Sequence, residues 1–193
     1  LDVHKICYTG SGVRASQLGM DKLETEKIFK KAGLLTPGIP KEFPIVIKPV
    51  NRGSSVGVNI AHDFQELEVS IKNALRHSRR LMAQEYIQGR ELTCGVLEVN
   101  GRLKPLLPTE IIPKNKFFDY KAKYQKGASR EITPPKLPVA VIRRIQQAAL
   151  KTHRVIGANG YSRTDFILGK KLYVLEINTL PGMTETSLLP QEA

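Results

Sequence analysis

The stretch that decides the fold runs from Tyr161 to Asn178, YSRTDFILGKKLYVLEIN, where two alternating runs flank a short turn. Arg163 and Asp165 lie two residues apart on the first run, and Glu176 lies two residues before Asn178 on the second. Side chains two apart on a β-strand point to the same face of a sheet. In either register that a tight turn allows, the four polar side chains share one face. The pattern therefore predicts a β-hairpin with a strongly polar face.

This polar face carries oxygen ligands of the kind that Mg²⁺ prefers, namely two carboxylates and one amide oxygen. The intervening side chains are expected to face mostly into a core: Thr164, Phe166, Leu175 and Ile177. The alternative is a solvated face on which an arginine pairs with a carboxylate across the strands. Neighbouring carboxylates without a cation repel each other. The hairpin therefore favours a magnesium site.

Outward from this hairpin, the hydrophobic pattern alternates between helical and strand periods. Helices are expected at residues 21–32, 63–76 and 139–156, and the second of them should bury one apolar face: Phe64, Leu67, Ile71 and Leu75. Strands are expected at 43–48, 56–60 and 81–87, and a hairpin at 91–99 and 102–107, because Asn100-Gly101 is a strong hairpin signal. The fold class is α+β, with two lobes that meet near residue 90.

The composition is that of an ordinary globular domain, with 193 residues of which 41% are hydrophobic and 25% are charged. No apolar run approaches the roughly 20 residues of a membrane span, and no signal peptide is visible. Cys7 and Cys94 match no metal-site spacing and are too few for a disulfide framework. We therefore expect a cytoplasmic protein with no membrane partner.

The net charge of +12 is concentrated in one segment, since residues 114–144 carry nine Lys and Arg against two acidic residues. Such a patch suits a polyphosphate small molecule, a nucleic acid or an anionic lipid. Aromatic side chains between the charges keep nucleic acid as the weaker alternative. Residues 113–138 also contain four prolines and no clear periodicity, and long irregular loops in compact domains are commonly functional. We interpret this segment as a lid over an anionic ligand.

A second candidate for anion binding is the loop NRGSSVG at residues 51–57. Glycines let the backbone approach a ligand, and successive N–H groups with serine hydroxyls can hold phosphate. A plain glycine-rich turn explains the loop equally well. Lys48 closes the preceding apolar strand, which favours the phosphate interpretation.

Seven segments occur together in a recognisable order: YTGSG at 8–12, MDK at 20–22, IKP at 47–49, GSSVG at 53–57, FDYKAKY at 118–124, RTDF at 163–166 and EINTLPGMT at 176–184. The set resembles the D-alanine–D-alanine ligase family of the ATP-grasp superfamily, in its central and C-terminal domains. The resemblance covers essentially the whole chain. It implies an ATP-grasp fold of two α+β lobes with ATP bound between them.

The resemblance implies a role for each matching residue. The residues that would bind ATP are Lys22, Lys48, Ser54, Ser55, Gln84, Glu85, Ile87, Glu91 and Lys123. Among them, the lysines and serines would hold phosphates, residues 84–87 the adenine, and Glu91 the ribose. Two Mg²⁺ ions, for which Mn²⁺ can substitute, would be held by Asp165, Glu176 and Asn178.

The resemblance also implies the groups that act on the reacting carboxylate. Arg163 and the Gly182 N–H would stabilise an oxyanion, while Ser187 and Leu188 would bind the second D-alanine. Lys123 on the lid would reach the terminal phosphate, next to Tyr124. This pattern implies ATP-dependent ligation of two D-alanines through an acylphosphate, for peptidoglycan precursor synthesis, in a parent protein expected to be a homodimer.

Other interpretations remain open at this point. One is a D-alanine–D-lactate ligase, although the lid pattern resembles the dipeptide-forming type, and another is a different ATP-grasp carboxylate–amine ligase. A third is a non-catalytic nucleotide-binding fragment. The expected organisation is a remnant of an N-terminal domain at residues 1–20, a central lobe at 21–90 and a C-terminal lobe at 91–193. Most of the family's N-terminal domain, which contacts the first D-alanine, and its terminal helix are expected to lie outside this chain.

Overall fold

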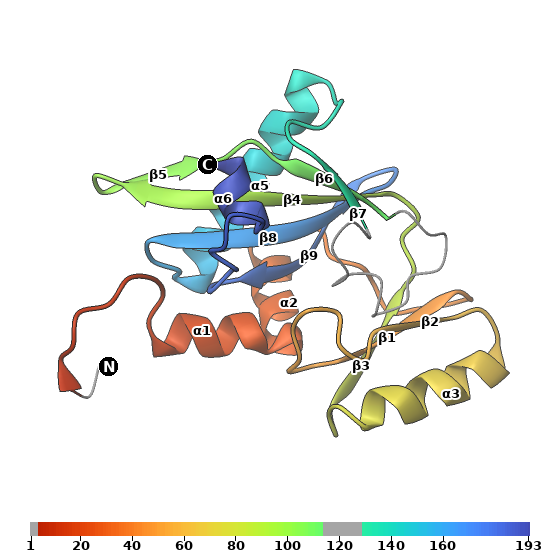
Figure 1. Ribbon diagram of the computed structural model, residues 1–193. Helices are drawn as coiled ribbons and strands as arrows, with labels where there is room; N and C mark the ends of the chain where they lie inside the picture. The colour runs from red at the N-terminus through yellow and green to blue at the C-terminus, as the bar shows by residue number, and fades with distance from the viewer. Residues whose placement is uncertain (1–3, 114–128) are drawn as a thin grey trace.

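The computed structural model describes residues 4–113 and 129–193, which form a large sheet, a small sheet and flanking helices (Figure 1). The large sheet has six strands, of which five run in the order β7-β6-β4-β8-β9 while β5 pairs with β4. All of its pairings are antiparallel. The bounds are Arg90–Val99 for β4, Arg102–Pro105 for β5, Thr109–Pro113 for β6, Ser129–Ile132 for β7, Tyr161–Leu168 for β8 and Leu172–Asn178 for β9.

The small sheet forms the second lobe. Its three strands, in the order β2-β1-β3, are Ile45–Pro49 for β1, Asn59–Ala61 for β2 and Leu81–Glu85 for β3. Helix α3, Phe64–Leu75, packs on one face of this sheet. The sequence therefore predicted both the α+β class and the division into two lobes.

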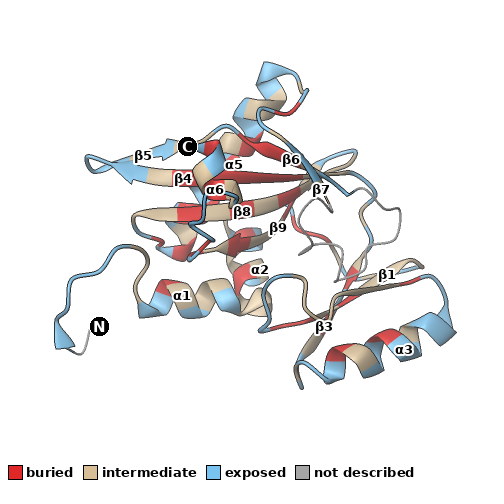
Figure 2. Ribbon diagram, viewed as in Figure 1, coloured by how far each residue is buried: buried red, intermediate tan, exposed pale blue. Residues whose placement is uncertain are grey.

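The main core lies between the large sheet and three helices: α1 at Val13–Met20, α2 at Lys22–Lys31 and α5 at Val139–Ile156. Figure 2 shows buried residues along β4, β8 and α5. The largest apolar side chains of this core are Phe29, Leu92, Ile145 and Phe166. Helix α6, Leu188–Glu192, contacts β4 and lies in front of the large sheet in Figure 1, with α5 behind it. One face of the sheet is therefore left for polar groups beside α6.

The β8–β9 hairpin confirms the predicted shared face, and Asp165 and Arg163 pair with Glu176 and Asn178 in one of the two registers that the sequence allowed. The pairs next to the turn are shifted from that register. Next to the turn, Phe166 pairs with Val174, whereas Asp165 pairs with Glu176. Leu175 is therefore an extra residue in β9, that is, a β-bulge. The bulge moves Val174 into the core in place of Leu175, which is only half-buried. The expectation that Leu175 faces the core was wrong for this reason.

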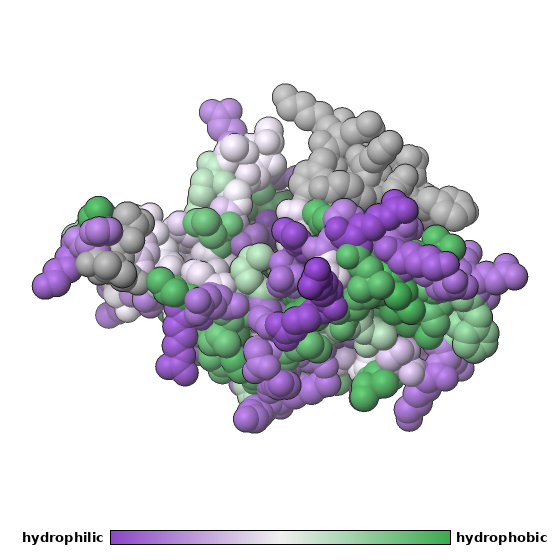
Figure 3. All heavy atoms as spheres, turned by 90° about the horizontal axis from the view of Figure 1, so that it is seen from below, coloured by the Kyte–Doolittle hydropathy of each residue, from purple (hydrophilic) through white to green (hydrophobic). Residues whose placement is uncertain are grey.

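Helix α3 contradicts the predicted buried face. Phe64 is 80% exposed, and Leu75 is also exposed, whereas Ser70 and Ala74 are buried. Small side chains let the helix approach β1 and β2 closely, so the larger apolar residues turn outward. Phe64 packs edge-to-face on Phe43, with ring centroids 5.0 Å apart. Figure 3 shows apolar side chains gathered on this side of the molecule.

Two further expectations need correction. The strand expected at 56–60 begins only at Asn59 and ends at Ala61 (β2), because Val56 and Val58 donate backbone hydrogen bonds to the carbonyls of Gly53 and Ser55 in tight turns. The segment expected to be irregular at 113–138 begins at the end of β6 and contains β7, and Pro113 pairs with Ser129. Residues 114–128 of that lid segment lie outside the described residues.

The proposed boundary at residue 21 remains a prediction. Helix α2 contacts α5 and β9 of the large lobe, while its first residues bond to the small lobe. No helix in the described part of the chain is long and apolar enough to cross a membrane.

Candidate functional site

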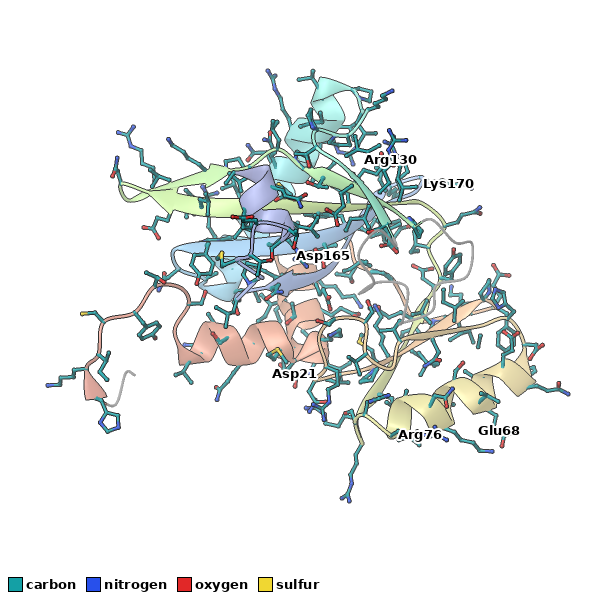
Figure 4. The ribbon with its side chains drawn as sticks, viewed as in Figure 1. Asp21, Glu68, Arg76, Arg130, Asp165 and Lys170 are labelled. Carbon is teal, nitrogen blue, oxygen red and sulfur yellow. The ribbon has the colours of Figure 1, made fainter. Side chains whose placement is uncertain are left out.

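The polar face of the β8–β9 hairpin brings the predicted metal ligands together. Asp165 and Glu176 stand directly opposite each other on neighbouring strands, and Asn178 stands opposite Arg163. All four side chains are partly buried. Figure 4 labels Asp165 on β8. The Oδ1 atom of Asn178 accepts a hydrogen bond from the backbone N–H of Leu180 at 3.0 Å, which holds the end of β9 in a turn.

The carboxylate of Asp165 is oriented by two donors. Arg163 donates to both of its oxygens, from Nε at 3.1 Å and from Nη2 at 3.2 Å. The charge of Asp165 raises the pKa of Arg163. Thr93, fully buried on β4, donates from Oγ1 to Asp165 Oδ1 at 2.8 Å. Sequence reasoning missed Thr93, because only the pairing of β4 with β8 brings it beside Asp165.

The Lys22 side chain contacts both lobes beside the Asp165–Glu176 pair. Its Nζ lies 3.0 Å from Glu176 Oε2 and donates to the backbone oxygen of Arg52, in the predicted phosphate loop. The Lys22 side chain is only 10% exposed. The start of α2 is held by Asp21, labelled in Figure 4, whose side chain accepts from the N–H groups of Leu23 and Glu24. A lysine ammonium, a carboxylate and the phosphate loop therefore meet at one point.

Asp21 is itself tied to the small lobe. Arg80 Nη1 donates to Asp21 Oδ2 at 2.8 Å. Burial raises the pKa of Asp21, but the hydrogen bonds from Glu24 and Arg80 outweigh it, so the net pKa is lowered. Asp21 therefore stays ionised and keeps both the helix start and Lys22 in place.

The predicted phosphate loop has an unusual backbone. Ser54 and Ser55 both have φ of 58°, in the left-handed region that residues other than glycine rarely adopt. Strained residues of this kind cluster at ligand sites. Lys48, on the preceding strand, shares one face of the small sheet with Gln84, since Lys48 pairs with Met82 and Val46 with Gln84. Two of the predicted nucleotide ligands are thus on the same face of the small sheet.

Neighbouring side chains of the predicted adenine-binding segment point in opposite directions. Gln84 is buried and donates from Nε2 to Glu26 Oε2 on α2 at 2.6 Å. The next residue, Glu85, points the other way and accepts from the Gly38 N–H at 2.8 Å. The Glu85 carboxylate is therefore engaged in holding the loop before β1. Ile87 and Glu91 are partly buried, and Glu91 lies near the start of β4.

The loop after β9 brings two predicted substrate-binding residues together. A Cβ atom added to Gly182 would lie 2.7 Å from Ser187 Oγ. Ser187 Oγ also accepts from the Thr184 N–H at 3.1 Å and lies 2.7 Å from Thr184 Oγ1. Leu188 follows as the first residue of α6. Gly182 is therefore required for the close approach of Ser187 to the backbone.

The residues present fit a magnesium ion, because they offer two carboxylates and an amide oxygen on adjacent strands. Each carboxylate is already paired with a cationic side chain, Asp165 with Arg163 and Glu176 with Lys22. No group of three His, Cys, Asp or Glu side chains suited to a metal occurs among the described residues, and the assignment of the Asn178 amide as a third ligand stays a prediction. Lys123 and Tyr124, predicted on the lid, lie outside the described residues.

The comparison with known proteins decides the family. Residues 22–193 match the family model described as D-ala D-ala ligase C-terminus. The chain belongs to the D-alanine–D-alanine ligase family. A D-alanine–D-alanine ligase from Desulfotalea psychrophila is 44% identical over 214 residues, which cover 100% of this chain and 66% of that relative. The family membership indicated by the sequence motifs is confirmed.

Solved structures in this family share the ATP-grasp arrangement. The VanG D-Ala:D-Ser ligase from Enterococcus faecalis superimposes with a TM-score of 0.89 at 30% identity, covering 99% of this chain and 61% of that one. The D-alanine–D-alanine ligase from Bacillus anthracis complexed with ATP has a TM-score of 0.83 at 32% identity, covering 100% of this chain and 66% of that one. The chain thus spans slightly less than two thirds of these proteins.

One buried carboxylate of this D-alanine–D-alanine ligase family member was missed entirely. Glu192, on α6, is 6% exposed, and its Oε2 accepts from the Gly95 N–H at 2.5 Å. Its Oε1 has no partner among the described residues. Burial raises the pKa of Glu192 to about 7, although hydrogen bonds from Gly95 and Thr109 and the charge of Arg163 oppose this shift. Sequence periodicity gave no signal for it, because α6 has only five residues.

Proposed function

We propose that the chain binds Mg²⁺-ATP between its two lobes, as part of an enzyme that ligates two D-alanines into D-alanyl-D-alanine. The observation that carries the proposal is the meeting of Asp165 and Glu176 with Lys22, whose ammonium also contacts the predicted phosphate loop at Arg52. Opposite carboxylates beside a lysine suit a cation bound to a triphosphate. Family membership and the ATP complex of the Bacillus anthracis relative support the same interpretation.

In this proposal the nucleotide lies along the inner face of the small sheet. Lys22 and Lys48 neutralise phosphate oxygens, and the backbone of Ser54 and Ser55 closes over them. Residues 84–87 receive the adenine, and Glu91 receives the ribose hydroxyls. Lys123 and Tyr124 belong to the lid that covers the terminal phosphate and excludes water.

Asp165, Glu176 and Asn178 would hold two Mg²⁺ ions. When bound, these ions neutralise charge on the transferring phosphoryl group. Thr93 and Arg163 keep Asp165 in a fixed orientation through the contacts described above. Ligand carboxylates that are fixed by surrounding hydrogen bonds bind metal more tightly than free ones.

The reaction proceeds in two steps. The first D-alanine carboxylate attacks the terminal phosphorus of ATP and becomes an acylphosphate, with ADP leaving. The amine of the second D-alanine, held by Ser187 and Leu188, attacks the acyl carbon and inorganic phosphate leaves. Arg163 and the Gly182 N–H stabilise the oxyanion of the tetrahedral intermediate, because preformed donors need no rearrangement as charge develops.

The cell-level proposals follow from this chemistry. The product is a peptidoglycan precursor, so the enzyme acts in the cytoplasm, where ATP and D-alanine are supplied, and we propose a homodimer for the complete protein. Neither a membrane nor a nucleic acid is needed, since the basic charge is used on a triphosphate.

Binding and catalysis can be tested separately. Isothermal titration calorimetry of the chain with Mg²⁺-ATP tests the first, and we expect saturable binding that is lost without Mg²⁺. Phosphate release by the complete protein tests the second, with D-alanine, D-serine and D-lactate compared as acceptors because a D-Ala:D-Ser ligase is also structurally similar. Stimulation by D-alanine above the other two supports the dipeptide ligase. Nucleotide binding without acceptor-stimulated phosphate release would leave only a binding module.

A further inference from the structure

A buried contact between the lobes bears on nucleotide choice. Gln84 on β3 is 5% exposed, and its Nε2 donates to Glu26 Oε2 on α2 at 2.6 Å. The other carboxylate oxygen of Glu26 pairs with Lys30. This pairing holds the Glu26 carboxylate in place facing Gln84. The contact lies on the face of the small sheet that also carries Lys48.

The chemistry of this pair leaves only one orientation for the Gln84 amide. An ionised carboxylate accepts hydrogen bonds and donates none, whereas a glutamine amide has a donating NH₂ and an accepting oxygen. Glu26 must therefore face the NH₂ group. The Oε1 atom is turned away from Glu26, and it is buried with no hydrogen-bond partner among the described residues.

A buried acceptor without a partner is costly, so its presence beside a proposed ligand site calls for a donor from that ligand. Adenine offers the N6 amino group as a donor, while guanine offers the O6 oxygen, an acceptor, at the equivalent position. An amide oxygen held in place satisfies adenine and repels guanine. Discrimination of this kind is strong when a buried polar group is left unpaired by the wrong substrate.

We infer that Glu26 is a specificity-determining residue, which orients the Gln84 amide so that its oxygen accepts from adenine and rejects guanine. The inference rests on the proposed nucleotide site and deepens it. Glu26 acts only through Gln84 and is therefore a positioning residue. Its removal frees the amide to rotate, so that NH₂ can face the base and donate to guanine O6.

The test measures the dissociation constants of Mg²⁺-ATP and Mg²⁺-GTP by calorimetry for the chain and for Glu26→Ala and Glu26→Gln. In Glu26→Ala we expect the preference for ATP over GTP to fall about tenfold or more, and in Glu26→Gln, whose amide can either accept from the Gln84 NH₂ or donate to its oxygen, to fall by less. The matched control is Glu24→Ala, since Glu24 is on the same helix and pairs with Lys27 at 2.7 Å. The control should leave the preference unchanged. Thermal unfolding of each variant verifies that it is folded.

A pair with the donor and acceptor roles exchanged provides the rescue. In Glu26→Lys with Gln84→Glu, the lysine donates to one oxygen of residue 84 and leaves the other as an acceptor, so the preference for ATP should return. A merely structural role for Glu26 would change affinity for both nucleotides equally and leave the ratio intact, which would overturn the inference alone. Binding of neither nucleotide by the unmodified chain would overturn the proposed function and this inference together.

Discussion

Replacing Glu192 by Gln should make the protein more stable above neutral pH and remove one component of its pH dependence. The glutamate is 6% exposed, and burial raises the pKa of its carboxyl group from 4.5 to about 7. Between about pH 4.5 and pH 7, Glu192 therefore stays mostly protonated in the folded state but loses its proton in the unfolded state. Stability therefore falls as pH rises from about 4.5 to 7 and levels off above it.

The size of the effect follows from the pKa difference. Each pKa unit corresponds to about 1.4 kcal/mol, so the ionised Glu192 side chain costs on the order of 3 kcal/mol of folding free energy at pH 8. Glutamine can still accept from the Gly95 N–H through its amide oxygen, and it carries no charge to bury. Glu192→Gln should thus match the parent near pH 4.5 and exceed it near pH 8.

Urea unfolding at pH 5 and pH 8 measures this difference directly. The control is Glu185→Gln, which removes an exposed carboxylate from the loop before α6. Every other titrating group is common to both proteins. The informative quantity is therefore how the difference in unfolding free energy between variant and parent changes from pH 5 to pH 8. If Glu192→Gln differed from the parent by the same free energy at both pH values, the reasoning about the buried carboxyl group would be refuted.

Three other substitutions test separate parts of the structure. Thr93→Val keeps the side-chain shape but removes the hydrogen bond to Asp165, so calorimetry should show Mg²⁺-ATP affinity weakened about tenfold. The control Thr93→Ser should have an affinity near that of the parent. Equal affinities in parent and Thr93→Val would contradict the role of Thr93 as a positioning residue. Gly95→Ala would place a Cβ atom 2.4 Å from Leu189 Cδ1, and urea unfolding should show a loss of about 1–3 kcal/mol as α6 is displaced; parental stability would contradict this packing. Gly157→Ala, at φ of 74° after α5, should cost about 1 kcal/mol in the same assay, and no loss would show that this helix end tolerates a side chain.

Much of the fold could be predicted because local patterns agree with the tertiary structure. The limits of α5 at 139–156 and of both strands of the β8–β9 hairpin match the expected ranges. Strong amphipathic periodicity and the glycine at 157 suffice there, since both signals are local. The shared face of Asp165 and Glu176 was also predicted correctly. The bulge at Leu175, which moves Val174 into the core, depends on side-chain packing and has no local signal.

The features that the sequence did not predict depend on contacts between distant segments. In α3, hydrophobicity suggested Phe64 as a core residue, but the close approach to the small sheet requires Ser70 and Ala74 there. The pairing of Thr93 with Asp165 and of Glu26 with Gln84 spans 72 and 58 residues of sequence. Such partners emerge only when the strands and lobes are assembled. The shared face of the predicted metal ligands could be predicted because their spacing along two strands is local.

The most direct test of the central claim, that Asp165 and Glu176 hold the magnesium of a bound nucleotide, is the Mg²⁺-ATP affinity of Asp165→Asn and Glu176→Gln. Each change removes one carboxylate charge and keeps the side-chain shape, and Mg²⁺ needs such charge to offset its dehydration. Calorimetry should show affinity at least about tenfold weaker in each variant, a loss of about 1.4 kcal/mol, with Glu185→Gln unchanged. Parental affinity in both variants would contradict the assignment of this carboxylate pair as the metal site.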